Sequence, residues 1–538
     1  MKYFPFPSFR PRQKEAIEFV LDSFANGKRV VFLESPTGAG KSAIAYTVAK
    51  HFDKAYYLTA TKILQNQLIN DFGHDKSLAT IKGRNAYECK LWPKMIRKAK
   101  EDGDAIRSTL IAELSRPEFK FNCNVGVCKI IKKVAKMGEC VPNEFPGALI
   151  NGMPSCAYWY ANFRARAAQM CVMNFDSFLY QTVFTDAFPK RNFMCLDEAH
   201  NTEGKLLDFV SITISDRDLD IILEERKTPE EYAKYFDEID LMGRVRLLAA
   251  TASANDKIKK LERLESMLTR LALLREVDND KWVCNFTKKR HRMIELKPLF
   301  IRKYANELLF SKADKILLMS ATILSHRTMV DALGLDENEV ASYKMPSVFP
   351  VENRPIYFEP CGSLSYKNKV RTYPRLVETV DRICEKYPDN KGIIHTHNFE
   401  IANLLIDACD SSDRFLFQKD FVSKDEMLEE HSQYENSVII APAMHEGLNL
   451  TDNDSRFQII CKVPYPNQNA NPQLKKRVEI SWNYYVWLTA LKICQSYGRS
   501  VRHDKDWAHT YIVDEDFGRF FSMAANILPE WFLEAIQI

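Results

Sequence analysis

Short apolar runs recur along the chain, and turn or capping residues follow them. They form two sets, one at residues 30–33, 55–58, 193–196 and 315–319, and one at 392–395, 437–440, 458–461 and 511–513. Runs of this kind are typical of buried parallel strands, and amphipathic helical stretches alternate with them. The chain is therefore predicted to be an α/β protein with two doubly wound parallel-sheet lobes, whose motif-bearing loops follow the C-terminal ends of the strands.

Two stretches interrupt the first lobe. Residues 84–171 are rich in cysteine and basic side chains, whereas residues 206–308 are charged and have a helical pattern. Within the second stretch, four leucines recur at 3-4-3 spacing: Leu261, Leu264, Leu268 and Leu271. This spacing predicts the core of a helical hairpin, and no chemistry is assigned to it.

The length of 538 residues exceeds what one hydrophobic core usually serves, so we expect several domains. No apolar run reaches the roughly 18 residues that a membrane-spanning helix needs. The first residues also lack the basic start, apolar stretch and cleavage site of a signal peptide. We therefore expect an intracellular protein, cytoplasmic if it is bacterial or viral in origin.

The net charge of +4 does not indicate a nucleic-acid binder by itself. Basic residues are instead concentrated locally, because residues 90–137 hold 12 Lys or Arg against 5 acids. A solvated helical face and a surface that contacts phosphates both fit this segment.

The chain has 13 cysteines, and without a secretion signal they do not suggest a disulfide framework. Eight are scattered and are interpreted as small core residues. The other five fall between positions 89 and 156: Cys89, Cys123, Cys128, Cys140 and Cys156.

Residues 35–42 read SPTGAGKS and lie between a predicted strand and a predicted helix. Glycines let backbone N–H groups close around phosphate oxygens, and the helix directs its positive end at them. Lys41 is then expected to neutralise the phosphates, and the Ser42 hydroxyl to coordinate Mg²⁺. An ordinary loop before a helix is the competing interpretation, since Ser35 replaces the first glycine of the usual pattern.

A second apolar run ends in two adjacent acids, Asp197 and Glu198. Their position predicts that Asp197 holds Mg²⁺ and that Glu198 orients or deprotonates an attacking water. Near the C-terminus, Gln495, Arg499 and Arg502 recur at intervals of four and three, so we expect them on one helix face. Arginines offered by a second lobe stabilise charge on a transferring phosphoryl group.

In this order, the motifs resemble the XPD/DinG family of iron–sulfur superfamily 2 DNA helicases. The resemblance implies an adenine-side element at Arg10 and Gln13, a DNA contact at residues 59–67, a DEAH box ending at His200 and a coupling motif at residues 320–322. It also implies later helicase motifs at residues 392–396, 444–449 and 495–502, the second of which departs from the family pattern at Asn449. The residues expected around ATP are Arg10, Gln13, Ser35, Thr37, Gly38, Gly40, Lys41 and Ser42, and those expected to be catalytic are Lys41, Asp197, Glu198, His200, Gln495, Arg499 and Arg502.

The same resemblance implies two RecA-like lobes, the first interrupted by an iron–sulfur domain and a helical arch domain. The expected boundaries are 1–83, 172–205 and 309–325 for the first lobe, 84–171 for the iron–sulfur domain, 206–308 for the arch and 326–538 for the second lobe. It assigns a [4Fe–4S] cluster to Cys89, Cys123, Cys128 and Cys156, with Cys140 as a substitute for Cys123. Zinc suits four cysteines equally well in ligand chemistry.

The function implied is ATP-dependent, Mg²⁺-dependent unwinding of DNA with 5′→3′ movement along a single strand, in repair or replication. Single-stranded and forked DNA are the expected partners, and the protein is expected to be monomeric. Two alternatives stay open. One is a nucleic-acid-binding scaffold switched by ATP, and the other is a motor on RNA–DNA hybrids, since motors that track a backbone read little sequence.

Overall fold

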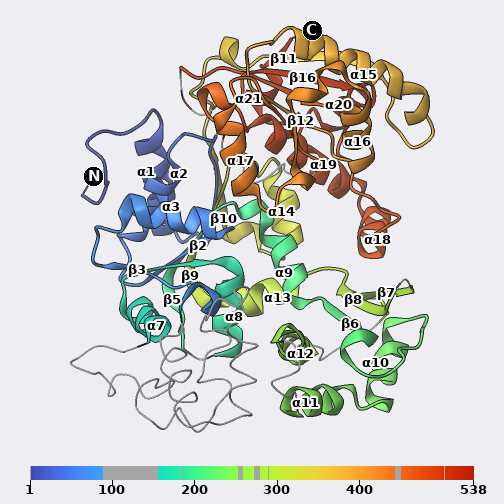
Figure 1. Ribbon diagram of the computed structural model, residues 1–538. Coiled ribbons are helices and arrows are strands. Elements are labelled where there is room, and N and C mark those ends of the chain that lie inside the picture. The colour runs from blue at the N-terminus through green and yellow to red at the C-terminus, as the bar shows by residue number, and fades with distance from the viewer. Residues whose placement is uncertain are drawn as a thin grey trace, which may run out of the picture.

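The computed structural model describes residues 2–88, 156–185, 187–251, 258–271, 279–288, 290–442, 450–501, 503 and 505–537. Cys89, Cys123, Cys128, Cys140, the basic segment 90–137, Asn449 and Arg502 lie outside these ranges. Within them the chain forms two parallel sheets with helices around them and a smaller helix-rich unit beside the first lobe (Figure 1). This arrangement confirms the predicted α/β class with two parallel-sheet lobes.

In the part of the chain that is described, the first lobe has a seven-stranded sheet. In spatial order its strands are β10 (Val340–Lys344), β1 (Val30–Glu34), β9 (Ala313–Ser320), β5 (Arg191–Leu196), β2 (Ala55–Thr59), β4 (Met170–Asn174) and β3 (Leu78–Thr80), all parallel. Strands β1, β2 and β4 are buried at every residue, because helices cover both faces of the sheet. The covering helices are α1 (Gln13–Ala25), α2 (Lys41–Ala49), α3 (Lys62–Phe72), α7 (Ala157–Ala167), α8 (Phe175–Phe184), α9 (Thr202–Val210) and α14 (His326–Leu333).

The second lobe repeats this plan with seven described strands. Their order is β13 (Phe415–Phe417), β14 (Val438–Ile440), β12 (Gly392–His395), β15 (Phe457–Ile460), β16 (His509–Asp514), β11 (Ile356–Gly362) and β17 (Ile536–Gln537). Its helices are α15 (Lys369–Glu385), α16 (Phe399–Ala408), α17 (Lys424–Gln433), α18 (Pro472–Ile480), α19 (Trp482–Tyr497), α20 (Asp516–Ala524) and α21 (Glu530–Leu533). All eight apolar runs identified in the sequence are strands of these two sheets.

The insertion at residues 206–308 is less purely helical than the sequence predicts. Its helices are α10 (Pro229–Glu238), α11 (Leu241–Thr251) and α12 (Ile258–Leu271), and Leu264 and Leu271 of the predicted stripe are buried. Beside them lies an antiparallel sheet in the order β6 (Ile212–Ser215), β8 (Arg292–Pro298) and β7 (Trp282–Lys288). Because charged residues alternate with apolar ones along β8, the sequence pattern of this strand does not stand out from the charged segment around it.

The predicted boundary between residues 325 and 326 lies too early. Strand β10 pairs in parallel with β1, from Val30 opposite Val340 to Glu34 opposite Lys344. Residues 340–344 are therefore the edge strand of the first sheet, and the chain crosses to the second lobe in residues 345–355. The sequence did not reveal this strand because only its first residue is buried and its pattern is polar.

The two lobes share a buried interface. One cluster of buried apolar side chains includes Phe32 and Leu196 of the first lobe together with Trp487 and Ile512 of the second. The Trp487 indole of α19 donates a hydrogen bond of 3.0 Å to the Ile323 carbonyl oxygen, three residues after β9. Because both partners are buried, this bond ties α19 to the segment that follows the coupling motif.

A buried ion pair crosses the same interface. Glu203 of α9 accepts hydrogen bonds from Arg477 of α18 at 2.6 Å and from the Tyr484 hydroxyl at 2.9 Å. The Arg477 guanidinium also lies 3.9 Å from the centre of the Tyr484 ring. Both oxygens of the Glu203 carboxylate are thus partnered, which is what a buried charge requires.

Arg477→Met should destabilise the folded chain by roughly 3–5 kcal/mol, because it leaves the Glu203 carboxylate buried without its cation. The double substitution Glu203→Gln with Arg477→Met should recover most of this loss, as urea denaturation would measure. Lys190→Met is the control, because its partner Asp314 and Lys190 itself are more than half exposed, and it should cost less than about 1 kcal/mol. Equal losses for the two single variants would contradict the expected difference.

Candidate nucleotide site between the two lobes

The phosphate-binding loop joins β1 to α2 and is braced by the N-terminal segment. Gly40, the residue before α2, has φ 80°, and a Cβ atom there would lie 2.3 Å from Gln13 Nε2. The left-handed backbone favours glycine at this position, and any side chain there would also displace the Gln13 amide. Gln13 Nε2 donates to the Gly40 carbonyl oxygen at 3.1 Å, and the Arg10 guanidinium donates to that of Gly38.

The predicted loop residues do not all face the same way. Lys41 and Ser42 line a cleft of about 920 Å³, and so do Thr37, Gly38 and Gly40. Ser35 is fully buried instead, and its amide donates to the Ser320 carbonyl oxygen at 2.9 Å. Ser35 thus joins the start of the loop to the coupling motif and is not one of the residues that line the cleft.

The two acids lie at the end of β5, opposite the phosphate-binding loop in the same cleft. The Asp197 amide donates to the Leu58 carbonyl oxygen at 2.9 Å, and Asp197 Oδ1 accepts from the Glu198 amide at 3.0 Å. Glu198 has φ 53°, a left-handed conformation that residues with a side chain seldom adopt. Strain of this kind clusters at functional sites, where the surrounding structure enforces it.

Burial and, to a smaller extent, the neighbouring Glu198 carboxylate together raise the pKa of Asp197 to about 6, although the Lys41 ammonium opposes the rise. The carboxylate is therefore ionised at neutral pH but poorly solvated. A half-buried anion that water solvates poorly favours a divalent cation as its partner, and the Ser42 hydroxyl in the same cleft offers a second oxygen ligand. These residues fit Mg²⁺.

His200 links the acidic motif to the coupling motif. Its Nδ1 atom lies 2.7 Å from Ser320 Oγ and 3.5 Å from Glu198 Oε2. Ser320 Oγ in turn accepts a hydrogen bond of 3.0 Å from the Thr322 amide. A change in the position of Glu198 is thereby passed through one imidazole to β9 and the turn that follows it.

The second lobe contributes Gln495, Gly498 and Arg499 to the cleft. A Cβ atom at Gly498 would lie 4.0 Å from Thr37 Oγ1, so the lobes approach closely at the phosphate-binding loop. The prediction of one helix face for Gln495 and Arg499 is wrong, because α19 ends at Tyr497 and Gly498 caps it. Both residues nevertheless line the same cleft, Gln495 from the helix and Arg499 from the turn beyond.

The segment expected to contact DNA, residues 59–67, also borders this cleft. Thr61 caps α3 by accepting a hydrogen bond of 3.3 Å from the Leu64 amide, and both residues line the cleft with Gln67.

The helicase motif expected at residues 392–396 lies in the second lobe, and its His395, at the end of β12, is fully buried there.

The structure describes the segment that leads into the cysteine-rich insertion and the segment that leads out of it, and the two pack together. The Arg84 guanidinium lies 4.8 Å from the Tyr158 ring centre and 5.5 Å from that of Trp159. The Tyr87 and Tyr158 rings meet edge to face at 5.6 Å. Cys156 immediately precedes α7, so these contacts bring the start of the insertion beside the one predicted cluster ligand that the structure describes.

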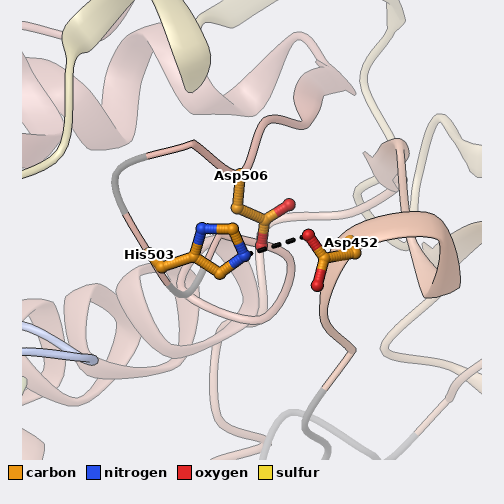
Figure 2. A group of neighbouring side chains, drawn as sticks. All are labelled: Asp452, His503 and Asp506. Carbon is orange, nitrogen blue, oxygen red and sulfur yellow. Dashed lines mark hydrogen bonds and ion pairs between the residues drawn. The ribbon is translucent and has the colours of Figure 1, made fainter.

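One polar cluster escaped the sequence analysis. Asp452, His503 and Asp506 meet where the segments after β14 and after α19 come together (Figure 2). His503 Nε2 lies 2.9 Å from Asp452 Oδ1, whereas Asp506 is buried and accepts a hydrogen bond of 2.9 Å from Arg456. Arg456 offsets the charge of Asp506, and the hydrogen bond between His503 and Asp452 joins two segments that line the cleft. No short-range signal in the sequence links residues so far apart.

Comparison with known proteins follows the same division into lobes. Residues 6–223 match the family model "Type III restriction enzyme, res subunit", and residues 380–535 match "Helicase C-terminal domain". The ATP-dependent DNA helicase CHL1 of Candida albicans is 32% identical over 117 residues, which cover 19% of this chain and 14% of the relative. The protein of the same name from Scheffersomyces stipitis is 23% identical over 248 residues, which cover 38% and 29%. The matched segments thus span less than a third of these relatives.

A solved structure described as XPD helicase superposes with a TM-score of 0.65 at 16% identity, covering 97% of this chain and 98% of the other. The chain therefore has the fold of the XPD helicases, with two RecA-like lobes. The fold that the resemblance to the XPD/DinG family implies is therefore confirmed. Among the described residues, no helix is long and apolar enough to cross a membrane.

Asp197→Asn should stabilise the metal-free protein at pH 7.5, by up to about 3 kcal/mol, since a folded-state pKa near 6 makes the ionised form unfavourable. The gain should shrink as the pH falls through 6, because the wild-type carboxyl group then takes up a proton. Thermal unfolding in EDTA from pH 5 to pH 8 measures this difference. A destabilised variant at pH 7.5, or a gain independent of pH, would contradict the assignment of a buried charge.

Proposed function

We propose that this protein is an ATP-dependent DNA helicase. One observation carries the proposal: a single cleft between the lobes is lined by Lys41, by Asp197 with Glu198, and by Arg499 from the opposite lobe. Two lobes that share one nucleotide can be drawn together by it and released after hydrolysis. The names of the CHL1 relatives supply the substrate class, DNA.

The residues of the cleft divide the chemistry among them. The amides of the loop at Gly38 and Gly40 and the first turn of α2 bind phosphate oxygens, and Lys41 neutralises their charge. Asp197 and Ser42 hold Mg²⁺, which when bound offsets negative charge on the phosphates. Glu198 orients the attacking water, and Arg499 approaches from the second lobe to stabilise charge that develops in the transition state.

Movement requires that the state of the nucleotide reach the second lobe, and two successive contacts along one described route support this. His200 connects Glu198 with Ser320 at the end of β9. Trp487, which is on the same helix as Gln495, donates a hydrogen bond to the carbonyl oxygen of Ile323, just beyond that strand. A shift at the acidic motif is thus transmitted to α19 over a few buried contacts, and the polarity inferred from the family resemblance is 5′→3′.

Lys41→Ala should lower ATP hydrolysis by at least 100-fold, and Glu198→Gln should do the same while leaving nucleotide bound, because the amide cannot accept a proton. Both should abolish unwinding of duplexes with 5′ or 3′ single-stranded tails, with the wild type preferring the 5′ tail. Binding of single-stranded DNA should persist in both variants.

Lys14→Ala is the matched control, because Lys14 is exposed on α1 and does not line the cleft. Hydrolysis stimulated by DNA without any strand separation in the wild type would favour the ATP-switched scaffold. Unwinding of RNA–DNA hybrids in preference to DNA duplexes would favour the hybrid motor. Retained hydrolysis in Lys41→Ala would refute the proposed site.

We further propose that the cysteine-rich insertion holds a [4Fe–4S] cluster through Cys89, Cys123, Cys128 and Cys156. Packing of Arg84 on Tyr158 and Trp159 supports this, because it brings the described residues that precede Cys89 in the chain close to the helix that begins just after Cys156. Four thiolates satisfy such a cluster, and a nearby guanidinium offsets part of its negative charge.

Cys156→Ser should lower the iron and sulfide content of anaerobically purified protein and its visible absorbance, and should impair unwinding more than hydrolysis. Cys284→Ser, which changes a half-buried thiol of β7, is the control and should keep the wild-type iron content. Colourless wild-type protein loaded with zinc would overturn the cluster in favour of a zinc site.

A further inference from the structure

We propose that the base of the bound nucleotide stacks on an aromatic wall formed by Trp531 of the second lobe and Phe349 of the crossing between the lobes. The inference rests on the proposed function, since it concerns the same nucleotide, but it assigns a role to residues that no motif covers. Both side chains line the cleft together with Phe6, Arg10 and Gln13 of the first lobe.

The order of the strands gives the direction in which the base must lie. Asp197 follows β5, which is separated from β1 by β9, whereas β10 lies on the other side of β1. Phosphates held by the loop after β1 have their reactive end toward Asp197 and Glu198. The base therefore extends the opposite way, toward β10, where α1 also packs, with its Phe19 ring 5.0 Å from that of Tyr343.

The second lobe meets the first on this same side. The chain leaves β10 at Lys344 and enters β11 at Ile356, and Phe349 lies within this crossing. Strand β11 is paired with β17 at the edge of the second sheet, and Trp531 lies in α21, just before β17. Figure 1 shows α21 close to β11 in the upper part of the molecule. The crossing and the C-terminal segment thus close the base end of the cleft.

A buried arginine fixes the two halves of this wall. Arg354 is only 4% exposed, and its Nε donates to the Phe349 carbonyl oxygen at 3.2 Å. Its guanidinium also donates to the Trp531 carbonyl oxygen and to the Glu534 carboxylate. The Tyr497 hydroxyl donates to the Arg354 carbonyl oxygen at 2.7 Å. One guanidinium therefore positions the backbone of both wall residues before any ligand arrives.

The wall is also connected to the phosphate end. The Trp531 ring stacks on that of Tyr497, with ring centres 5.8 Å apart and planes 10° apart. Tyr497 precedes Gly498, which approaches Thr37 of the phosphate-binding loop. Trp531 is partly exposed whereas Tyr497 is buried, so Trp531 is the ring that has a face available to a ligand. Stacking on such a face depends on a flat π-system and is available to any nucleobase.

The test compares two ligands that share the phosphates and differ in the base, Mg²⁺-ADP and Mg²⁺-pyrophosphate, in calorimetric titrations of the full chain. Trp531→Leu keeps an apolar side chain without a flat face, and it should weaken ADP binding by about tenfold. Its affinity for pyrophosphate should stay at the wild-type value. Trp531→Phe should restore ADP binding, and Trp482→Leu, on an exposed tryptophan outside the cleft, should change neither affinity.

Unchanged ADP affinity in Trp531→Leu would overturn the inference, and so would an equal loss for ADP and pyrophosphate, because that result means only a disturbed fold. Lys41→Ala in the same titrations tests the proposed function separately. If Lys41→Ala leaves pyrophosphate binding intact, the phosphate site itself is misassigned, whatever Trp531 does.

Discussion

Burial of α19 against the first lobe is the contact on which the shared cleft depends. Trp487 on this helix is almost fully buried and hydrogen-bonded to the Ile323 carbonyl oxygen, and the same helix ends where Gly498 meets Thr37. Because the helix is rigid, packing near its start also sets the position of its end. Gln495 and the turn that carries Arg499 are positioned in this way. The chemistry assigned to the second lobe therefore depends on apolar packing at a distance from the phosphates, which lets a conformational change control hydrolysis.

Two non-glycine residues, one in the acidic motif and one just after the coupling motif, have left-handed backbone, and charged groups restrain each of them. Glu198 is held between Asp197 and His200, whereas Leu324, with φ 62°, is held by its own peptide groups. The Leu324 amide donates to Glu34 at 3.0 Å, and its carbonyl oxygen accepts from Lys344 at 2.9 Å. Burial raises the pKa of Glu34, and the Lys344 ammonium and the Leu324 amide offset that rise. The end of β1 thus clamps the turn that touches Trp487, so loop, acidic motif and second lobe form one connected unit.

Much of this arrangement could be predicted from the sequence, because parallel strands buried on both faces are visible as apolar runs and phosphate chemistry needs few residue types. The run at residues 30–33 placed Lys41 at the start of the helix that follows a strand and a loop, and the run at residues 193–196 placed Asp197 directly after a strand, as found. Strand β10 was missed because pairing with β1 across some 300 residues leaves no local signal, and the helix expected to carry Arg499 stops at Gly498. Trp531, Phe349 and Arg354 come together only through the order of strands in two sheets, and no spacing rule records that. Apart from the boundary corrected by strand β10, the domain boundaries stay predictions, and so do the cluster ligands Cys89, Cys123, Cys128 and Cys156.

The buried pair of Glu203 and Arg477 has a mechanical consequence. Separating these two side chains would strand a charge in an apolar interface, so the lobes cannot simply move apart there. The peptide crossing at residues 345–355 is a second connection between the lobes. A rotation about the line that joins these two places is a relative motion that keeps both of them intact. The lobes should therefore open by rotating about this line, and the gap between them should be widest at the rim of the cleft that lies farthest from it.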